Sequence, residues 1–510
     1  MPWSSGDSLN SANLNYKSGS VYDVRAYGAV SDGSTNDATA LQATIDAAGA
    51  SGGVVFLPAG AYRINSTLVI DDTAPIILRG VGDESIISYG ASTHMLRLKN
   101  AAHVIEHLQI KAASTFTDGR GIIIESTATD AAVRYCKFAN TPASAIEVQA
   151  GNVGTVVAYS RIANAGYGSG VNAPFTAHIR AADVQDCQIV GNRLSNGTAK
   201  GIDFGQATSG NTRIRVEGNS ISNFSNIGIG VGGSFGARIA NNAIQDCQDN
   251  GIDLNALSGI SHYGTTCVGN FVDNCKDGIF FGHEAQESTL QGNTLSNCTR
   301  GIRVWDGATH VVINGNVINT TSSGPGILVH SNSSGRPGYI NIVGNLVREA
   351  KESGVSMVGC DVVSLVGNVI RRPANHGIAG DDADVTCIIG NEIVNIGTAA
   401  ANTYDAVLLD DVSAGYFVQS NLITGATRYL FNMGNSVNGT LANNVWDTDG
   451  STGNVTGINS SELLGNHKRG DRTPTASTAS GTAGESSYDD TYFYVCTSTN
   501  SWGRLELAQF

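Results

Sequence analysis

The sequence predicts an all-β protein in which short parallel strands stack as the coils of a β-solenoid. Three observations support this fold class. A short phrase with alternating apolar residues and an asparagine recurs every 23 to 30 residues from residue 190 onward. Glycine is abundant at 63 residues and proline scarce at 9, which is typical of many tight turns between strands. The chain has 510 residues, so a repeat architecture or several domains are expected.

The asparagine of each phrase marks the repeat, as in "VGNRLSN", "EGNSISN" and "QGNTLSN". The series is Asn192, Asn219, Asn242, Asn270, Asn293, Asn316, Asn345, Asn368, Asn391, Asn421 and Asn444. One repeat is too short to bury its own apolar face, so the coils must stack. We expect each asparagine to tolerate a left-handed backbone and to hydrogen-bond to its neighbour one coil away.

The cysteines follow the same repeat. Cys247, Cys275 and Cys298 occupy the same place in successive phrases, which predicts an inward stack. All nine cysteines are spread without zinc-type CxxC pairs, so we expect reduced, buried side chains.

Residues 21–64 differ from the repeats. In "NDATALQATIDAA", Leu41, Ile45 and Ala48 have helical spacing behind a Thr/Asn/Asp start, which predicts a short amphipathic helix. "GGVVFLPAGAYRI" then reads as the first strands. A helix over the open end of a solenoid covers an otherwise exposed sheet edge.

The stretch "VYDVRAYGAVSDGSTNDATALQATIDAAGASGGVVFLPAGAYRI" at 21–64 closely resembles the N-terminal signature of pectate-lyase-3-like proteins. This resemblance implies a right-handed, single-stranded parallel β-helix that acts on polysaccharide. The Asn-Thr-Asp and Gly-His-Gly motifs of polygalacturonases and the Asp-Pro-His-Glu motif of mannuronan epimerases are missing here, since Asp203 is followed by "FGQ". No catalytic residue is therefore carried over from the family.

Both ends resemble phage tail proteins. "GDSLNSANLN" resembles the segment with which many of them begin, and residues 467–510 resemble segments that close phage fibres and spikes. The expected organisation is an attachment segment at 1–20, a capping helix with first strands at 21–64, a β-helix with a substrate groove at 65–465, and a linker with a C-terminal hairpin at 466–510. The hairpin strands are predicted at 492–497 and 502–507. The resemblance to tailspikes implies a homotrimer in a phage tail or another extracellular setting.

Charge and hydropathy exclude some partners. The formal net charge of −14 argues against nucleic acid or an anionic membrane as a partner. No stretch reaches the roughly 20 apolar residues of a membrane span. The first 15 residues have no basic start and no apolar run, so no signal peptide is predicted.

Candidate functional residues emerge when the phrase that follows each asparagine is aligned. If the isoleucine in "GIDF" is buried, the next residue and the one two further on point outward. The first outward column then reads Asp203, Gly230, Asp253, Phe280, Arg303, Leu328, Ser356, Ala379 and Leu408. The second reads Gly205, Gly232, Asn255, Gly282, Trp305, His330, Val358, Asp381 and Asp410, and Glu147 continues the same face upstream.

This pattern predicts a trough lined by carboxylates and aromatic side chains. Glycines remove side chains, and an aromatic ring beside a trough suits the apolar face of a sugar. We predict Asp203, Asp253, Glu284 and Asp306 as catalytic candidates. The predicted substrate contacts are Glu147, Asn255, His283, Arg303, Trp305 and His330. An ordinary solvated β-face is the competing interpretation.

Spacing suggests a mechanism for the first pair. Asp203 and Asp253 lie two coils apart, so their backbones should be roughly 9–10 Å apart. Inverting glycosidases hold their carboxyl groups about 6.5–9.5 Å apart with a water between them. The preferred function is therefore hydrolysis of a bacterial surface polysaccharide without a cofactor, one aspartate protonating the leaving oxygen and the other activating water.

Three points stay open, of which two are rival functions and one is a possible metal site. A polysaccharide lyase would need a cation at the sugar carboxylate and a base, which Arg303 with His330 or His283 could supply, and it could use calcium. The segment "GDDAD" at 380–384 with Asp410 and Asp411 fits either a calcium site or a solvated acidic rim. A receptor-binding spike without catalysis is the third.

Overall fold

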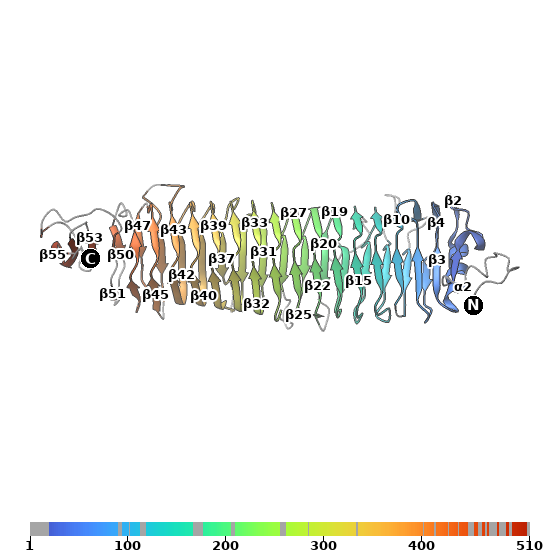
Figure 1. Ribbon diagram of the computed structural model, residues 1–510, viewed down its shortest axis with the longest axis horizontal. Coiled ribbons are helices and arrows are strands. Elements are labelled where there is room, and N and C mark those ends of the chain that lie inside the picture. Colours follow the sequence, from blue (N-terminus) through green and yellow to red (C-terminus); the bar gives the residue numbers. More distant parts are fainter. Residues whose placement is uncertain are drawn as a thin grey trace. The chain divides into compact units, whose positions relative to one another are not determined.

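The computed structural model describes residues 20–89, 94–100, 102–112, 119–166, 177–205, 210–255, 262–283, 285–332, 335–400, 402–412, 415–426, 428–436, 438–446, 453–456, 462–464, 467–468, 477–478, 486–488 and 492–506. The chain divides into two compact units, Met1–Asp253 and Leu254–Phe510. Strands dominate both units, and the expected all-β, right-handed parallel β-helix is confirmed (Figure 1). The predicted attachment segment lies outside the described residues except for Ser20.

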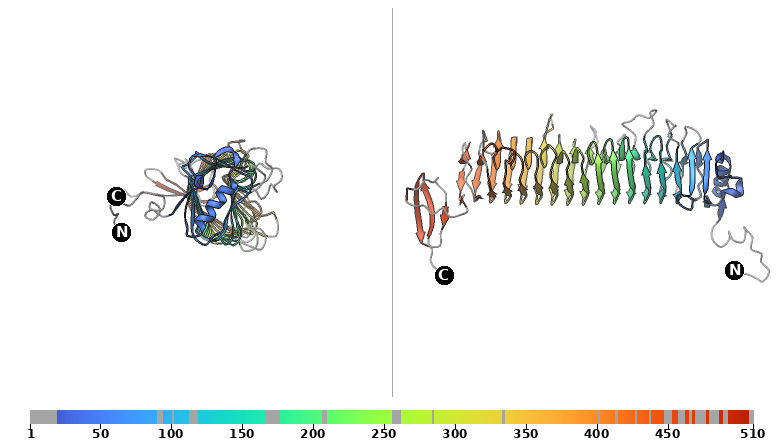
Figure 2. Two further views of the ribbon diagram at one scale, coloured as in Figure 1. Left: turned by 90° about the vertical axis from the view of Figure 1, so that its right-hand side faces the viewer. Right: turned by 90° about the horizontal axis from the view of Figure 1, so that it is seen from above.

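The first unit begins with a helical cap. The 3-10 helix η1 (Val24–Tyr27) is followed by α2 (Ala38–Gly49), and α2 packs on the first strands and lies across the open end of the coils (Figure 2). Leu41, Ile45 and Ala48 are fully buried, so the predicted amphipathic helix and its capping position are confirmed.

Each coil of the first unit contributes one strand to each of three parallel faces. The first face consists of β1 (Val21–Asp23), β3 (Gly53–Phe56), β6 (Ile76–Arg79), β9 (Val104–Glu106), β12 (Ala132–Arg134), β15 (Val156–Ala158), β18 (Gln188–Val190), β22 (Arg215–Glu217) and β26 (Arg238–Ala240). The second consists of β2 (Asp32–Asn36), β4 (Gly60–Ile64), β7 (Ser85–Tyr89), β10 (Gln109–Lys111), β13 (Lys137–Ala139), β16 (Arg161–Ala163), β19 (Arg193–Gly197), β23 (Ser220–Phe224) and β27 (Ala243–Cys247). The third consists of β5 (Leu68–Ile70), β8 (Leu96–Leu98), β11 (Ile122–Ile124), β14 (Ile146–Val148), β17 (Ala177–Ala182), β20 (Lys200–Gly205), β24 (Ile229–Val231) and the start of β28 (Ile252–Asn255). Two successive coils also contain a short additional strand between the third face and the next first face. These strands, β21 (Asn211–Thr212) and β25 (Ser234–Phe235), pair in parallel.

The second unit repeats these three faces. Its first face holds β29 (Thr266–Val268), β32 (Gln286–Gln291), β35 (Thr309–Asn314), β38 (Gly338–Val343), β45 (Gly415–Gln419), β48 (Thr440–Ala442) and β51 (Glu462–Leu464). Its second holds β30 (Phe271–Asp273), β33 (Thr294–Ser296), β36 (Val317–Asn319), β39 (Leu346–Arg348), β41 (Val369–Arg371), β43 (Glu392–Val394), β46 (Leu422–Thr424), β49 (Val445–Trp446) and β52 (His467–Lys468). Its third holds β31 (Asp277–Gly282), β34 (Arg300–Trp305), β37 (Ile327–His330), β44 (Val407–Asp410), β47 (Tyr429–Asn432) and β50 (Gly453–Thr456). The long strands β40 (Val355–Val366) and β42 (Ile378–Ile389) bend from the third face into the first.

Stacked isoleucines show how the core is built. On the third face of the first unit, Ile146, Ile179, Ile202 and Ile229 pair in register and are all fully buried. Residues on either side of them point outward because side chains alternate along a strand. The predicted inward and outward positions on this face are therefore confirmed.

The asparagines form a continuous ladder inside each unit. In the second unit, the backbone N–H and the Nδ2 of each asparagine donate to the Oδ1 of the next, as from Asn345 to Asn368 at 2.9 and 3.0 Å. The predicted contact from coil to coil is confirmed. The predicted left-handed backbone is wrong for these asparagines, because the residue before each takes that conformation. Gly191 has a φ of 65°, and Asn241 a φ of 54°.

Cysteines and the C-terminal strands also agree with the sequence. All nine cysteines are free, and all except the half-buried Cys387 are buried. The Cys275 and Cys298 thiols contact each other inside the second unit, which raises the pKa of Cys298. The predicted hairpin is present as β54 (Tyr492–Ser498) and β55 (Ser501–Glu506), with β53 (Ser486–Tyr488) added on the other side of β54. Among the described residues, no helix has the length and hydropathy needed to cross a membrane.

Candidate functional site

The predicted outward column exists in the first unit with the predicted register. Glu147 pairs with Arg180, Arg180 with Asp203, and Asp203 with Gly230, on four successive strands of the third face. Asp253 follows on β28, which pairs with β24. The structure therefore places Glu147, Asp203 and Asp253 on one outward column. It also adds Arg180, which the sequence analysis missed.

Asp203 is less exposed than the sequence predicts. Its neighbours Ile202 and Phe204 are fully buried, as alternation requires, but Asp203 itself is only 4% exposed. The reason is Lys200, whose Nζ lies 2.7 Å from the Asp203 Oδ1 and covers the carboxylate. The Oδ2 of Asp203 accepts no hydrogen bond from the described residues. The expectation of a solvated side chain is wrong here, because an ion pair within the same strand shields it.

Glycines make room for this carboxylate. A Cβ on Gly230 would lie 3.2 Å from the Asp203 Oδ1 and 3.7 Å from Lys200 Cδ, and a Cβ on Gly205 would lie 3.6 Å from the Asp203 Oδ2. The Asp203 carboxylate thus lies beside Gly230 of β24, the strand between those of Asp203 and Asp253. This agrees with the predicted trough of glycines.

Asp253 has a different environment. It is half-buried, and its Oδ2 accepts a hydrogen bond from Asn250 Nδ2 at 2.8 Å. The two aspartates therefore differ in their donors: an ammonium group holds Asp203, whereas an amide contacts Asp253.

Glu147 lies within a network of arginines. Its Oε2 accepts a hydrogen bond from Arg120 Nε, and its Oε1 lies 3.9 Å from an Arg180 guanidinium nitrogen. The sequence signal for Arg180 was weak. The segment "AHIRAAD" at 177–183 alternates like the repeated "GIDF" phrase, but it lacks the glycine before the isoleucine. Glu147 is therefore neutralised by these neighbours, and Arg180 stands between it and Asp203.

The predicted columns of the second unit are also confirmed in register. Phe280 pairs with Arg303, Arg303 with Leu328, and Trp305 with His330, on β31, β34 and β37. The structure thus brings Arg303, Trp305 and His330 together.

Arg303 is the centre of this cluster. Its Nε donates to His330 Nε2 at 2.9 Å, and its guanidinium lies 5.1 Å from the Phe280 ring centre and 4.9 Å from that of Trp305. Asp277, which is fully buried, pairs with both Arg300 and Arg303. Burial lowers the pKa of Arg303, although Asp277 opposes this effect. The Asp277 carboxylate thus forms ion pairs with two guanidinium groups.

Aromatic rings surround Arg303. The Trp305 ring centre lies 4.9 Å from that of His283 and 6.2 Å from that of His330, with the His330 ring nearly parallel. The buried Trp305 Nε1 has no hydrogen-bond acceptor among the described residues, and the Oδ1 of Asn255, beside Gly282, has no donor among them. Burial, and then the charge of Arg303, lower the pKa of His330, so its ring is neutral near pH 7. Neutral aromatic surface with unsatisfied polar atoms suits a sugar ring.

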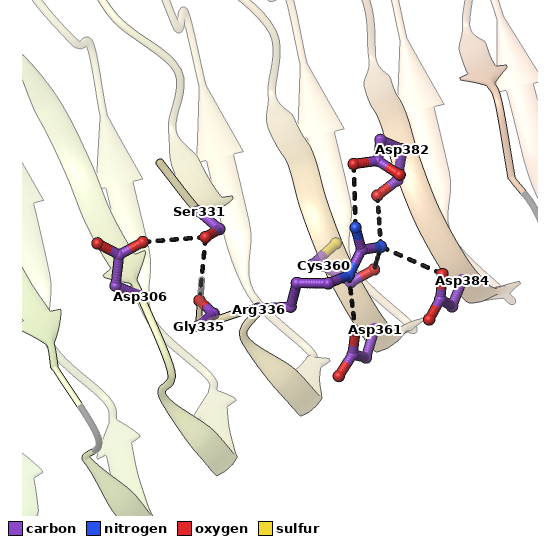
Figure 3. A network of polar contacts seen from close by, with 8 residues as sticks. All are labelled: Asp306, Ser331, Gly335, Arg336, Cys360, Asp361, Asp382 and Asp384. Atoms are coloured by element: carbon purple, nitrogen blue, oxygen red, sulfur yellow. Dashed lines mark hydrogen bonds and ion pairs between the residues drawn. The ribbon is translucent and has the colours of Figure 1, made fainter. Parts of the chain in front are cut away.

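Two catalytic candidates of the second unit are less favourable. The Oδ1 of Asp306 accepts a hydrogen bond from the Ser331 hydroxyl at 3.0 Å (Figure 3). The same oxygen accepts a hydrogen bond from the Asn332 N–H at 2.9 Å. These contacts give Asp306 a role in holding the chain that follows β37. Glu284 lies outside the described residues.

The acidic segment at 380–384 forms ion pairs with an arginine from an earlier part of the chain. Arg336 pairs with Asp361 at 2.7 Å, Asp382 at 3.0 Å and Asp384 at 3.2 Å, and donates to the Cys360 and Asp382 carbonyl oxygens at 2.8 Å (Figure 3). A guanidinium group therefore pairs with Asp382 and Asp384, two of the carboxylates that were considered for calcium.

Asp381 of this segment has an exposed side chain, and the neighbouring Asp410 is half-buried. Asp381 lies in register with Asp410, and burial, followed by the charge of Asp410, raises the pKa of Asp381. Among the described residues, no group of three or more His, Cys, Asp or Glu side chains could hold a metal ion. The described carboxylates of this segment therefore do not form a calcium site.

Comparison with known proteins gives two family matches, each to less than half of the chain. The family model described as rhamnogalacturonase A/epimerase, pectate lyase-like, matches residues 21–253. The model described as periplasmic copper-binding protein (NosD) matches residues 173–345 and 261–401.

Similar sequences and structures cover the chain unequally. The mannuronan C5-epimerase AlgE3 of Azotobacter vinelandii is 38% identical over 86 residues, which is 15% of this chain and 5% of that protein. Alginate lyase 7 of the same organism is 41% identical over 73 residues, 13% of this chain and 8% of that protein. The chain thus matches only a small part of these relatives. The catalytic domain of a GH87 α-1,3-glucanase, solved with tetrasaccharides, is alike in fold, with a TM-score of 0.52, 15% identity and coverage of 72% and 68% of the two chains.

Proposed function

We propose that this chain, a pectate lyase-like parallel β-helix, binds a polysaccharide and cleaves it by hydrolysis. The names of the similar proteins support a polysaccharide as the substrate, since they describe enzymes that act on alginate, mannuronan or α-1,3-glucan. The observation that carries the proposal is the pair Asp203 and Asp253, which lie on one outward column with Gly230 between them.

The environments of the two aspartates suggest their roles. Lysine only donates hydrogen bonds and an ionised carboxylate only accepts them, so the contact with Lys200 fits an ionised Asp203. Its Oδ2 is then the atom available to take a proton from water. In this mechanism the water oxygen bonds to the anomeric carbon while its proton passes to Asp203. The glycosidic C–O bond breaks, and the leaving oxygen takes a proton from Asp253.

The Arg303 cluster supplies the binding surface in the second unit. The half-buried Trp305 offers an apolar face to a sugar ring, and Phe280 and the Arg303 guanidinium support its ring from below. His283 and His330 complete the rim.

Depolymerisation assays with two aspartate variants test the proposal. Wild type should release new reducing ends from a polysaccharide panel, and Asp203→Asn and Asp253→Asn should each lower the rate by about 100-fold or more. Asp186→Asn is the matched control, because Asp186 forms an exposed ion pair with Arg213 elsewhere in the first unit. Full activity in both site variants would contradict the assignment of the pair.

One observation favours a lyase as the second candidate. In a lyase, Arg303 would pair with the uronate carboxylate and release the His330 Nε2 to which it now donates, and that nitrogen would then take the proton. A lyase would give products that absorb in the ultraviolet, and the absorbance would be lost in His330→Gln. Binding without chain shortening would instead identify a receptor-binding spike. The trimer and the phage-tail location stay predictions, and sedimentation analysis of the full chain would test the trimer.

A further inference from the structure

Three stacked aromatic side chains form a ridge on the first unit, away from the column of Asp203. His107, Tyr135 and Tyr159 occupy the turns between the first and second faces in three successive coils. Their ring centres are 5.0 and 5.4 Å apart, and the rings are tilted by only 9° and 14°. Tyr135 is 49% exposed and Tyr159 is 55% exposed. The ridge is thus an accessible feature of the surface.

These residues adopt a backbone conformation that normally favours glycine. Their φ angles are 55°, 54° and 51°, and the next coils have Gly191 and Gly218 at the same position, both at 65°. A non-glycine residue in the left-handed region costs about 1–2 kcal/mol. Glycine would therefore suit these turns better if they only had to connect strands.

The exposed parts of the two tyrosine rings are their edges. Tyr135 lies between His107 and Tyr159, and a Cβ on Gly191 would come within 2.7 Å of the Tyr159 ring, so the backbone covers the last ring face. The Tyr135 and Tyr159 hydroxyl groups form no hydrogen bond with a described residue, so both can donate and accept.

Cations outnumber carboxylates on the first-face side of the ridge. Arg79 and Arg134 both pair with Glu106, at 2.5 and 2.7 Å, and Glu106 is only 3% exposed. Two guanidinium groups therefore share one carboxylate that is itself buried.

The second-face side repeats this imbalance. Lys137, Arg161 and Arg193 are in register on β13, β16 and β19. Lys137 and Arg161 share Asp83, at 3.4 and 2.7 Å, and Glu84 is the further acid in that loop. Arg193 forms no ion pair with a described residue. The excess of cations stands out in a chain whose net charge is −14.

We propose that this aromatic–basic ridge, formed by His107, Tyr135, Tyr159, Arg79, Arg134, Lys137, Arg161 and Arg193, binds an anionic polysaccharide strand. Lys137, Arg161 and Arg193 repeat at the strand spacing of about 4.8 Å, whereas Arg79 and Arg134 lie two coils apart on either side of Glu106. The tyrosine hydroxyls can bond to sugar hydroxyls between these cations. A single-stranded nucleic acid fits less well, because its bases need open aromatic faces, and both faces of Tyr135 and of Tyr159 are covered. The ridge extends the function to a second binding surface and does not depend on hydrolysis at Asp203.

Binding of the full-length protein to a charged and an uncharged polymer tests the ridge. Dextran sulfate, unmodified dextran and single-stranded poly-dT serve as probes in calorimetry and affinity electrophoresis. Wild type should bind dextran sulfate better than dextran, and added salt should weaken binding because it screens exposed charges. The triple variant Lys137→Gln, Arg161→Gln, Arg193→Gln should bind about tenfold more weakly. The double variant Tyr135→Gly, Tyr159→Gly should also bind more weakly, and glycine suits the left-handed turns.

The second unit provides a matched control. His310 and Tyr339 form a similar stack, with ring centres 4.8 Å apart, and Tyr339, in β38, is 56% exposed with a left-handed backbone at a φ of 55°. Tyr339→Gly should bind dextran sulfate like wild type. Unchanged binding in both ridge variants, an equal loss in Tyr339→Gly, no preference of wild type for dextran sulfate, or tighter binding of poly-dT would each overturn the proposal.

Discussion

Replacing one asparagine of the ladder should weaken the second unit strongly. The Asn368 Nδ2 donates to the Ile342 carbonyl at 2.8 Å and to the Asn391 Oδ1 at 2.9 Å. Its Oδ1 accepts from the Asn345 backbone N–H at 2.9 Å and from the Asn345 Nδ2 at 3.0 Å. Asn368→Ala removes all four hydrogen bonds. At about 1 kcal/mol for each bond, the free energy of unfolding should fall by about 4 kcal/mol.

Two measurements check this value. Urea unfolding of the full chain, followed by circular dichroism, gives the loss of stability, and hydrogen exchange should accelerate at the Asn345 amide because its acceptor is gone. Asn319→Ala is the control, since the half-buried Asn319 side chain forms no hydrogen bond with a described residue, and its effect should stay within about 0.5 kcal/mol. A loss below about 1 kcal/mol in Asn368→Ala, with unchanged exchange at Asn345, would refute the reasoning.

Further predictions concern calcium, pH and substrate binding. Arg336→Gln leaves three aspartates without their shared cation, so its melting temperature should fall and should recover with millimolar calcium, while wild type does not respond. Burial lowers the pKa of His178 to about 3 from about 6.5. The unfolded state therefore binds the proton first as pH falls through this window, and stability should drop by up to about 1.4 kcal/mol per pH unit in wild type and less steeply in His178→Gln. Trp305→Ala should lower kcat/KM on the cleaved polysaccharide by about tenfold or more, whereas Phe271→Ala, an exposed ring on the second face, should leave it unchanged.

Sequence periodicity was sufficient to place the outward column. The pairing of Asp203 with Gly230 and of Arg303 with Leu328 follows from the repeat, because a shift by one residue would turn every buried isoleucine to solvent. The capping helix was predictable for a similar reason, since Leu41 and Ile45 share one helical face. Both elements follow from the spacing of apolar residues over short stretches of the sequence.

Contacts between outward side chains were not predictable in this way. The ion pair between Lys200 and Asp203 depends on how a long side chain folds over a glycine, which alternation does not specify. Arg336 reaches Asp382 from 46 residues earlier in the sequence, so the composition of "GDDAD" alone could not reveal its cation. Arg180 was hidden because its coil lacks the repeated glycine.

The asparagine ladder has a direction with a consequence for synthesis. Every asparagine from Asn270 to Asn421 sends its backbone N–H and its side-chain amide toward the coil that follows in the chain. Until the next coil has been made, these two donors of a completed coil are left to water. Each completed coil therefore presents amide donors on its C-terminal side and an Oδ1 acceptor on its N-terminal side, so an unfinished ladder ends in donors at the edge nearer the C-terminus.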